Sequence, residues 1–169
     1  MLLFLHKGHR KNLLAIGILT AILIAIVWLT DIRSPNSYYH GGDPEKENVI
    51  GTVTLTIRCD TVAGRADHIP ENGIILEKTA FPIAEGDTVY TILTDAAKKY
   101  RISVENNGSA AHAYIAGIAY LYEFDYGDLS GWMYEVNGEQ PSVGAGEYRL
   151  KDGDVIEWRY TCNLGEDLT

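Results

Sequence analysis

Residues 86–100, GDTVYTILTDAAKKY, decide the fold, because they form the one convincing amphipathic helix after residue 30. Apolar residues recur at positions 89, 92, 93, 96, 97 and 100. This spacing places them on one continuous stripe that must pack against a core. Asp87 or Thr88 suits the start of the helix as a cap, and Lys98-Lys99 suits its carboxyl end.

Short strands separated by turns are expected on both sides of the helix. Residues 53–59 alternate apolar and polar side chains, which is the pattern of a half-buried strand. Further strands are expected at 73–76, 79–83, 102–105, 113–118, 132–136, 147–150 and 155–161. Turn residues at 106–108, 137–138 and 152–153 separate the later strands. One helix against several short strands predicts an α+β domain with a mixed sheet.

The start of the chain predicts a membrane anchor. Residues 13–29 carry no charge and are long enough, as a helix, to span a bilayer. Because Lys7, Arg10 and Lys11 precede them, the positive-inside rule keeps the amino terminus in the cytoplasm. We therefore predict a cytoplasmic flank at 1–11, a transmembrane signal anchor at 12–30, a flexible linker at 31–48 and an extracellular domain at 49–169. A cleaved signal peptide is the alternative, although its apolar run is usually shorter and followed by small residues.

Charge limits the classes of partner. The chain has a formal net charge of −9, and the residues beyond 30 hold 11 basic against 23 acidic side chains. Such an acidic body is a poor match for nucleic acid, whose phosphates attract clustered Lys and Arg. Neutral, cationic or aromatic partners are compatible with this charge.

Two cysteines follow residue 30, and each ends a predicted strand. If the first and last strands run side by side and parallel, Cys59 and Cys162 reach the same end of the sheet. A disulfide is then geometrically reasonable and compatible with export. Two separate buried thiols are the alternative.

Sequence motifs for catalysis are absent. No G-x-S-x-G, H-E-x-x-H, P-loop or G-x-G-x-x-G pattern occurs, and the five histidines lack metal-ligand spacing. We therefore expect no enzyme, no metal site and no intrinsic cofactor. Aromatic density is the more informative signal, since eight Tyr, Trp and Phe side chains fall between residues 114 and 148 among glycines. Core packing explains most such rings, but Tyr and Trp are also favoured at binding surfaces.

A family resemblance rests on an ordered set of segments. These are 73–76, 85–93, 113–118, 121–125, 130–138, 144–148 and 150–158, and SGWMYEVNG at 130–138 is the strongest. Together they resemble the transcobalamin carboxyl-terminal-like family over about residues 49–165. The family occurs in secreted and surface proteins of Gram-positive bacteria, often as a domain of unknown function. The resemblance implies a β-grasp-like fold, similar to the β domain that closes over one face of cobalamin in intrinsic factor and transcobalamin.

Two departures from that family matter. The carriers' separate helical domain is missing here, and Tyr126 and Ala145 stand near the positions of a second cysteine pair in relatives. Cys59 and Cys162 match the pair that remains.

The resemblance also implies a site. It places ligand contact at Trp132 and Tyr134 by stacking, at Val143 and Gly144 by close backbone approach, and at Tyr126 on the rim. The first hypothesis is a membrane-tethered domain that binds cobalamin or a related corrinoid and hands it to a transport partner. The second is a surface module for a protein or a glycan, and the third is an enzyme.

Overall fold

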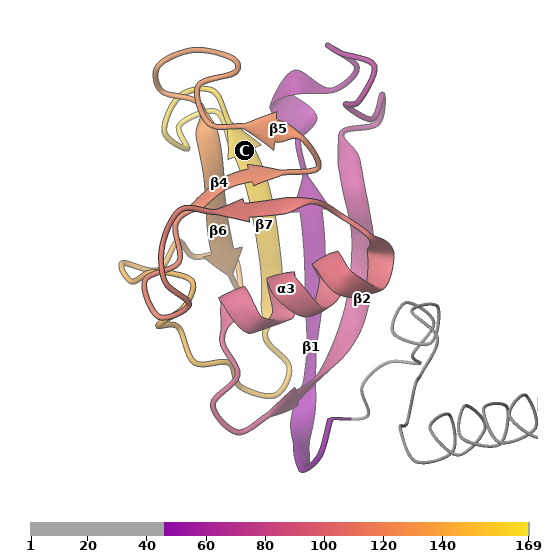
Figure 1. The fold of residues 1–169 in the computed structure, drawn as a ribbon, viewed down its shortest axis with the longest axis vertical. Helices are drawn as coiled ribbons and strands as arrows, with labels where there is room; N and C mark the ends of the chain where they lie inside the picture. Colours follow the sequence, from indigo (N-terminus) through magenta and orange to yellow (C-terminus); the bar gives the residue numbers. More distant parts are fainter. Residues whose placement is uncertain (1–45, 169) are drawn as a thin grey trace, which may run out of the picture. The chain divides into compact units, whose positions relative to one another are not determined.

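The structure is a computed structural model that describes residues 46–168 (Figure 1). In chain order its elements are β1 (Val49–Arg58), the 3-10 helix η1 (Asp60–Val62), β2 (Ile74–Ala84), α3 (Val89–Tyr100), β3 (Val104–Asn106), β4 (Ile115–Ile118), β5 (Leu121–Tyr122), β6 (Gly131–Val136) and β7 (Val155–Thr161). The predicted flank and anchor, and the predicted linker up to residue 45, lie outside the described residues. Within 46–168, no helix combines the length and the hydropathy needed to cross a bilayer.

Four strands form a mixed sheet in the order β2-β1-β7-β6. β1 and β7 run parallel, with Ile57 opposite Trp158, and the other neighbours are antiparallel. The expected parallel pairing of the first and last strands is therefore confirmed. β2 and β6 are the two edges of this sheet.

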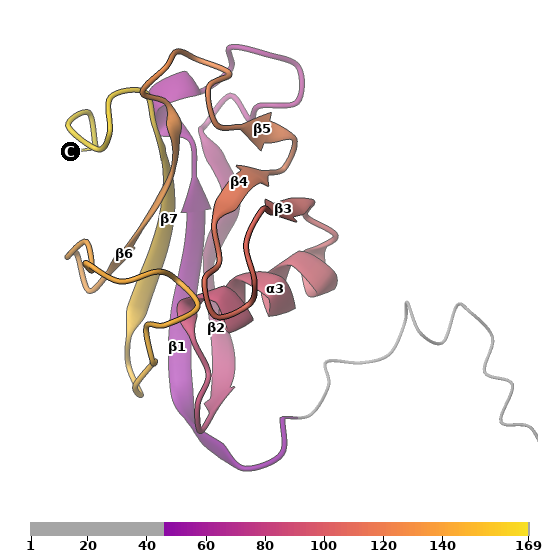
Figure 2. The same cartoon turned by 60° about the vertical axis from the view of Figure 1, so that its left-hand side comes forward.

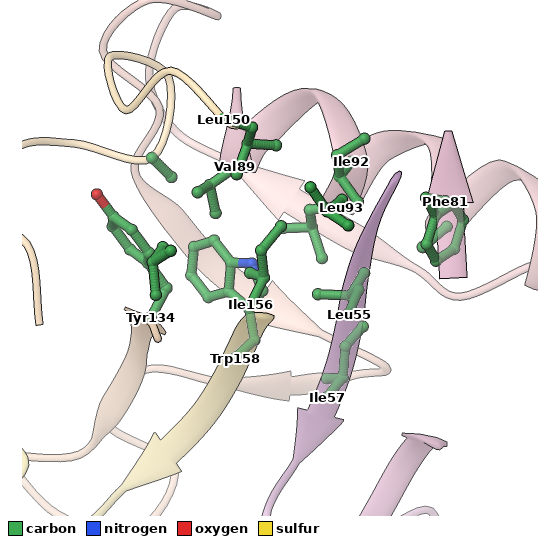
Figure 3. Packing of buried hydrophobic residues seen from close by; sticks show 14 of the residues in the cluster. Leu55, Ile57, Phe81, Val89, Ile92, Leu93, Tyr134, Leu150, Ile156 and Trp158 are labelled. Atoms are coloured by element: carbon green, nitrogen blue, oxygen red, sulfur yellow. The ribbon is translucent and has the colours of Figure 1, made fainter. Parts of the chain in front are cut away.

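One face of the sheet is covered by α3 and by a smaller sheet of order β3-β4-β5 (Figures 1 and 2). The buried side chains between these layers form one cluster (Figure 3). Its central members are Leu55 and Ile57 from β1, Ile156 and Trp158 from β7, and Val89, Ile92 and Leu93 from α3. Burying each such side chain contributes about 1.5–3 kcal/mol. The predicted α+β class, with one α-helix on a mixed sheet, is confirmed.

The ends of α3 follow from local chemistry. Thr88 is the N-cap: its hydroxyl accepts a 3.2 Å bond from the Thr91 amide, and the Thr91 hydroxyl accepts from the Thr88 amide at 3.3 Å. Asp87, the other candidate cap, instead accepts from the Ala84 amide at 2.8 Å. The helix ends where Arg101 adopts a left-handed conformation with φ 57°.

The sequence predicted two separate strands where the structure has one. Residues 73–76 and 79–83 were expected as two pieces, but β2 is a single strand. A register shift between the pairs Leu55–Thr79 and Ile57–Leu76 places an extra β2 residue at this point. Such a bulge resets the alternation of buried and exposed side chains, so the pattern resembles two strands.

Two other short segments differ between the prediction and the structure. Residues 147–150 are not a strand: only Arg149 forms a bridge, with Thr88. The segment forms a hydrogen bond with the start of α3 instead: the Val89 amide donates to the Tyr148 carbonyl at 3.4 Å. β5 was not predicted, and its two residues are too few to show a period.

The disulfide is not formed, and both cysteines are free. Arg58 pairs with Arg159, so the register continued by one residue sets Cys59 level with Tyr160. Cys162 lies two residues further along, or about 6.6 Å, on a strand about 4.8 Å away. The resulting Cα separation of about 8 Å exceeds the roughly 7 Å that a disulfide spans. Cys59 is buried in a small second cluster, and Cys162 packs against that cluster.

Candidate functional site: a cleft along the edge of β6

A cleft of about 280 Å³ lies beside the edge strand β6. We call it the β6 cleft. Its walls come from four segments of the chain, residues 113–115, 123–124, 128–134 and 144–145, and from the single residues Trp158, Thr161 and Leu164. Residues 30 or more positions apart in sequence thus converge on one strand edge.

Trp132 lines the cleft and is held by the protein. It is half-buried, and its indole N–H donates a 2.8 Å bond to the Leu121 carbonyl. Its ring meets Tyr160 edge-on, with centroids 5.3 Å apart. The ring is therefore fixed before any ligand arrives, which lowers the entropic cost of binding.

Tyr134 lines the cleft from a more buried position, with 9% of its surface exposed. Its hydroxyl donates a 2.6 Å bond to the Val143 carbonyl, and its ring lies 5.5 Å from that of Trp158. Burial, with the nearby Tyr148 and Glu147, raises the pKa of Tyr134 to about 12. The phenol is therefore neutral at physiological pH.

Of the remaining predicted site residues, Gly144 lines the cleft and Val143 and Tyr126 do not. Gly144 lines the cleft, and an added Cβ there would meet nothing within 4 Å. Val143 is exposed but contributes to this region only through the carbonyl that binds Tyr134. Tyr126 does not line the cleft: it packs edge-on against Tyr160 at 6.2 Å, under the Arg65 guanidinium. Three of the five predicted residues, Trp132, Tyr134 and Gly144, are brought together.

Exposed apolar residues at the cleft were missed from the sequence. They are Tyr114, Phe124, Leu129 and Leu164. Phe124 is the most informative, since it is 61% exposed and has φ 68°. A bulky residue in this left-handed region costs on the order of 1–3 kcal/mol, and such strain gathers at functional sites. No sequence signal marks this conformation.

Acidic groups dominate the charge around the cleft. Residues 102–148 contain no Lys or Arg but seven Asp or Glu. Glu123 and Asp128 line the cleft itself. The Tyr114 hydroxyl donates to the Glu123 carboxylate, and this hydrogen bond is the main reason that the pKa of Tyr114 is raised. The cleft therefore favours neutral or cationic ligands over anions. Among residues 46–168, no group of three His, Cys, Asp or Glu side chains is arranged to hold a metal ion.

One comparison with a solved structure bears on the fold, and a family comparison matches part of the chain. A family described as "Domain of unknown function (DUF4430)" matches residues 86–162. Haptocorrin in complex with Cbi is similar at a TM-score of 0.51 and 22% identity, over 68% of this chain. The match covers 25% of haptocorrin, so this chain corresponds to only a quarter of that protein. The chain therefore has a transcobalamin-like fold.

Two other comparisons add no argument about function. A candidate metal-binding protein from Ruminococcus gnavus ATCC 29149 aligns with a TM-score of 0.40 and 15% identity, over 66% of this chain and 96% of that protein. The low TM-score leaves this likeness without weight. A comparison with curated proteins finds no match.

Proposed function

We propose that the domain binds a corrinoid at the β6 cleft, as a non-enzymatic binding domain with a β-grasp-like fold. The observation that carries the proposal is the convergence of Trp132, Tyr134 and Phe124 on one cleft beside the open space at Gly144. Aromatic walls with a few polar groups suit a large, partly apolar ligand. The likeness to haptocorrin, which was solved with Cbi, supports the choice of ligand.

The size of the cleft sets how such a ligand would be held. Ligand pockets usually measure about 300–1,000 Å³ and enclose most of the ligand. The β6 cleft, at about 280 Å³, is slightly smaller than that range and suits only one edge of a corrinoid. We therefore propose that a partner protein covers the rest of the ligand.

Location completes the proposal. A signal anchor at 12–30 would hold the domain at the outer face of the cell membrane, with the amino terminus in the cytoplasm. The uncharged run at 13–29 and its basic flank support this arrangement. The corrinoid would then be collected outside the cell and passed to an uptake protein.

The test is a titration of the full chain in detergent with cobalamin, followed by the visible spectrum. We expect saturable binding that Phe124→Gly weakens at least about tenfold, because one exposed aromatic contact is removed. Tyr120→Gly is the matched control: Tyr120 is also exposed (67%) and left-handed (φ 63°) but does not line the cleft. Equal affinity for both variants would place the site elsewhere, and no spectral change with the unaltered chain would refute the proposal.

A further inference from the structure

In β6, the main-chain N–H and C=O groups of alternate residues point away from β7. The Val136 amide donates to the Glu139 carbonyl at 2.9 Å, and the Glu139 amide donates back at 3.1 Å. Both polar groups of Val136 therefore point away from β7. In an antiparallel ladder the direction of these groups alternates along the strand. The N–H and C=O groups of Trp132 and Tyr134 thus also point away from β7, toward the free edge.

The free part of this edge has clear limits. At its start, the Ser130 carbonyl accepts from the Phe124 amide at 3.1 Å, and at its end Val136 is paired with Glu139. Between these points, the outward N–H and C=O of Trp132 and Tyr134 bond no other group in the part of the chain that the structure describes. Four main-chain groups are therefore open for pairing.

The β6 cleft follows this edge. The four consecutive residues 131–134 all line it. Trp132 and Tyr134 lie on one face of the strand and Met133 on the other, so a cleft that all three line follows the edge of β6. The exposed side chains of Tyr114, Phe124 and Leu164 flank it. An added strand would find main-chain partners in the groove and apolar contacts on both sides.

The acidic charge around the cleft favours a basic peptide over a second copy of this domain. Glu123 and Asp128 line the cleft, and the surrounding residues 102–148 contain no Lys or Arg. A second copy of this domain would bring the same acidic rim against itself, and residues 46–168 hold twenty acidic against ten basic side chains. Like charges across an interface oppose association. A basic peptide is favoured by the same field.

We propose that the edge of β6 binds a short extended peptide that alternates apolar and basic residues. The peptide pairs through its backbone with Trp132 and Tyr134 and extends the mixed sheet by one strand. Its basic side chains lie near Glu123 and Asp128. The proposal goes beyond corrinoid binding and does not depend on it.

The first test uses hydrogen exchange of the full chain in detergent, read at each amide by NMR. In the free protein we expect the Met133 and Glu135 amides, which face β7, to be protected, and those of Trp132 and Tyr134 to exchange freely. A synthetic peptide of alternating Lys and Val should protect Trp132 and Tyr134 at least about tenfold. Unchanged exchange at both amides with bound peptide would overturn the pairing.

Matched peptides and variants test the chemistry. N-methylation of alternate peptide residues should weaken binding at least about tenfold, and a Glu-Val peptide should not bind. Glu123→Gln with Asp128→Asn should weaken the Lys-Val peptide about threefold to tenfold and reduce its salt dependence, since Gln and Asn remove charge while keeping polar shape. Equal binding of the methylated peptide, or self-association of the chain through β6, would refute the proposal. Peptide titrations without corrinoid keep this result separate from the corrinoid test.

Discussion

The Tyr134 hydroxyl donates a 2.6 Å hydrogen bond to the Val143 carbonyl. This bond joins the buried side of β6 to the loop that follows it, which contributes Gly144 and Ala145 to the cleft. Two residues expected to touch a ligand separately are thus partners of each other. The shape of the cleft wall depends on this bond.

Replacing Tyr134 with Phe should destabilise the domain by about 1–2 kcal/mol. The ring is kept, but the Val143 carbonyl loses its donor, and an unsatisfied polar group costs about this much. Urea denaturation of both proteins measures the difference. Tyr148→Phe is the control, because the Tyr148 hydroxyl has no hydrogen-bond partner within residues 46–168, and it should be close to neutral. Equal stability of Tyr134→Phe and the unaltered chain would contradict this reading.

The contribution of the Tyr134 phenol to stability should depend on pH in the alkaline range. The pKa of Tyr134 is raised to about 12, against about 10 when the chain is unfolded. The contribution of the neutral phenol to stability is therefore fully present below pH 10 and is lost as pH rises toward 12. We expect the stability difference between the unaltered chain and Tyr134→Phe to shrink over that interval. A difference that stays constant from pH 9 to 12 would be inconsistent with a buried phenol.

The turn between β4 and β5 should be open to stabilisation. Its two residues, Ala119 and Tyr120, both have positive φ, 52° and 63°. This type I′ geometry favours Asn-Gly, which the chain itself uses at Asn137-Gly138 with φ 57° and 77°. The double change Ala119→Asn, Tyr120→Gly should stabilise the domain by about 1–2 kcal/mol, measured by urea denaturation. A lower midpoint would show that the Tyr120 ring contributes more than its backbone strain costs.

Thiol labelling should separate the two cysteines. Burial, with the nearby Asp60 carboxylate, raises the pKa of Cys59 to about 11, so little thiolate exists at pH 8. Cys162 is only half-buried. In the folded chain without reductant, we expect an alkylating agent to label Cys162 and to label Cys59 only after unfolding. Absence of both labels in unfolded, unreduced protein would mean that the two sulfurs are bonded after all.

The sequence predicted the fold wherever side-chain period and strand direction agree. β7 was expected at 155–161 and occurs there, because Ile156, Trp158 and Tyr160 alternate without interruption. β2 was divided because the extra residue in it changes the period. The disulfide was expected from strand direction and from the family resemblance, and neither of these fixes the register of the two strands. A two-residue offset was enough to keep Cys59 and Cys162 apart.

Of the cleft residues, the sequence predicted Trp132 and Tyr134 on β6 and Gly144 in the loop that follows it. Trp132 and Tyr134 share a face of β6, so the sequence places them together. Phe124 and Leu164 reach the same cleft from loops, where left-handed residues and tertiary hydrogen bonds set their direction. Those determinants have no periodic signal. Tyr126 was expected at the rim, but the loop turns it toward Tyr160 instead.

The last prediction concerns the carboxyl-terminal wall of the cleft. Asp167 accepts hydrogen bonds from the Thr161 hydroxyl and, at 2.9 Å, from the Cys162 amide. This arrangement closes the turn that holds Leu164, whose amide donates to the Leu129 carbonyl at 3.1 Å. The turn therefore positions an exposed apolar side chain at the cleft.

The pKa of Asp167 is lowered, because these hydrogen bonds to its carboxylate outweigh the opposing effect of burial. A carboxyl group with a lowered pKa stabilises the folded turn above its ordinary pKa of 3.8, and this contribution is lost as pH falls through the lower, folded value. Asp167→Asn should remove that pH dependence and speed amide exchange at Cys162 and Leu164 at pH 6, with a smaller effect on global unfolding. Glu166→Gln, at an exposed neighbour bonded only to Asn163 among the described residues, is the control and should leave both amides unchanged. If Asp167→Asn exchanges like the control, the turn is held by Leu164 and Leu129 rather than by the carboxylate.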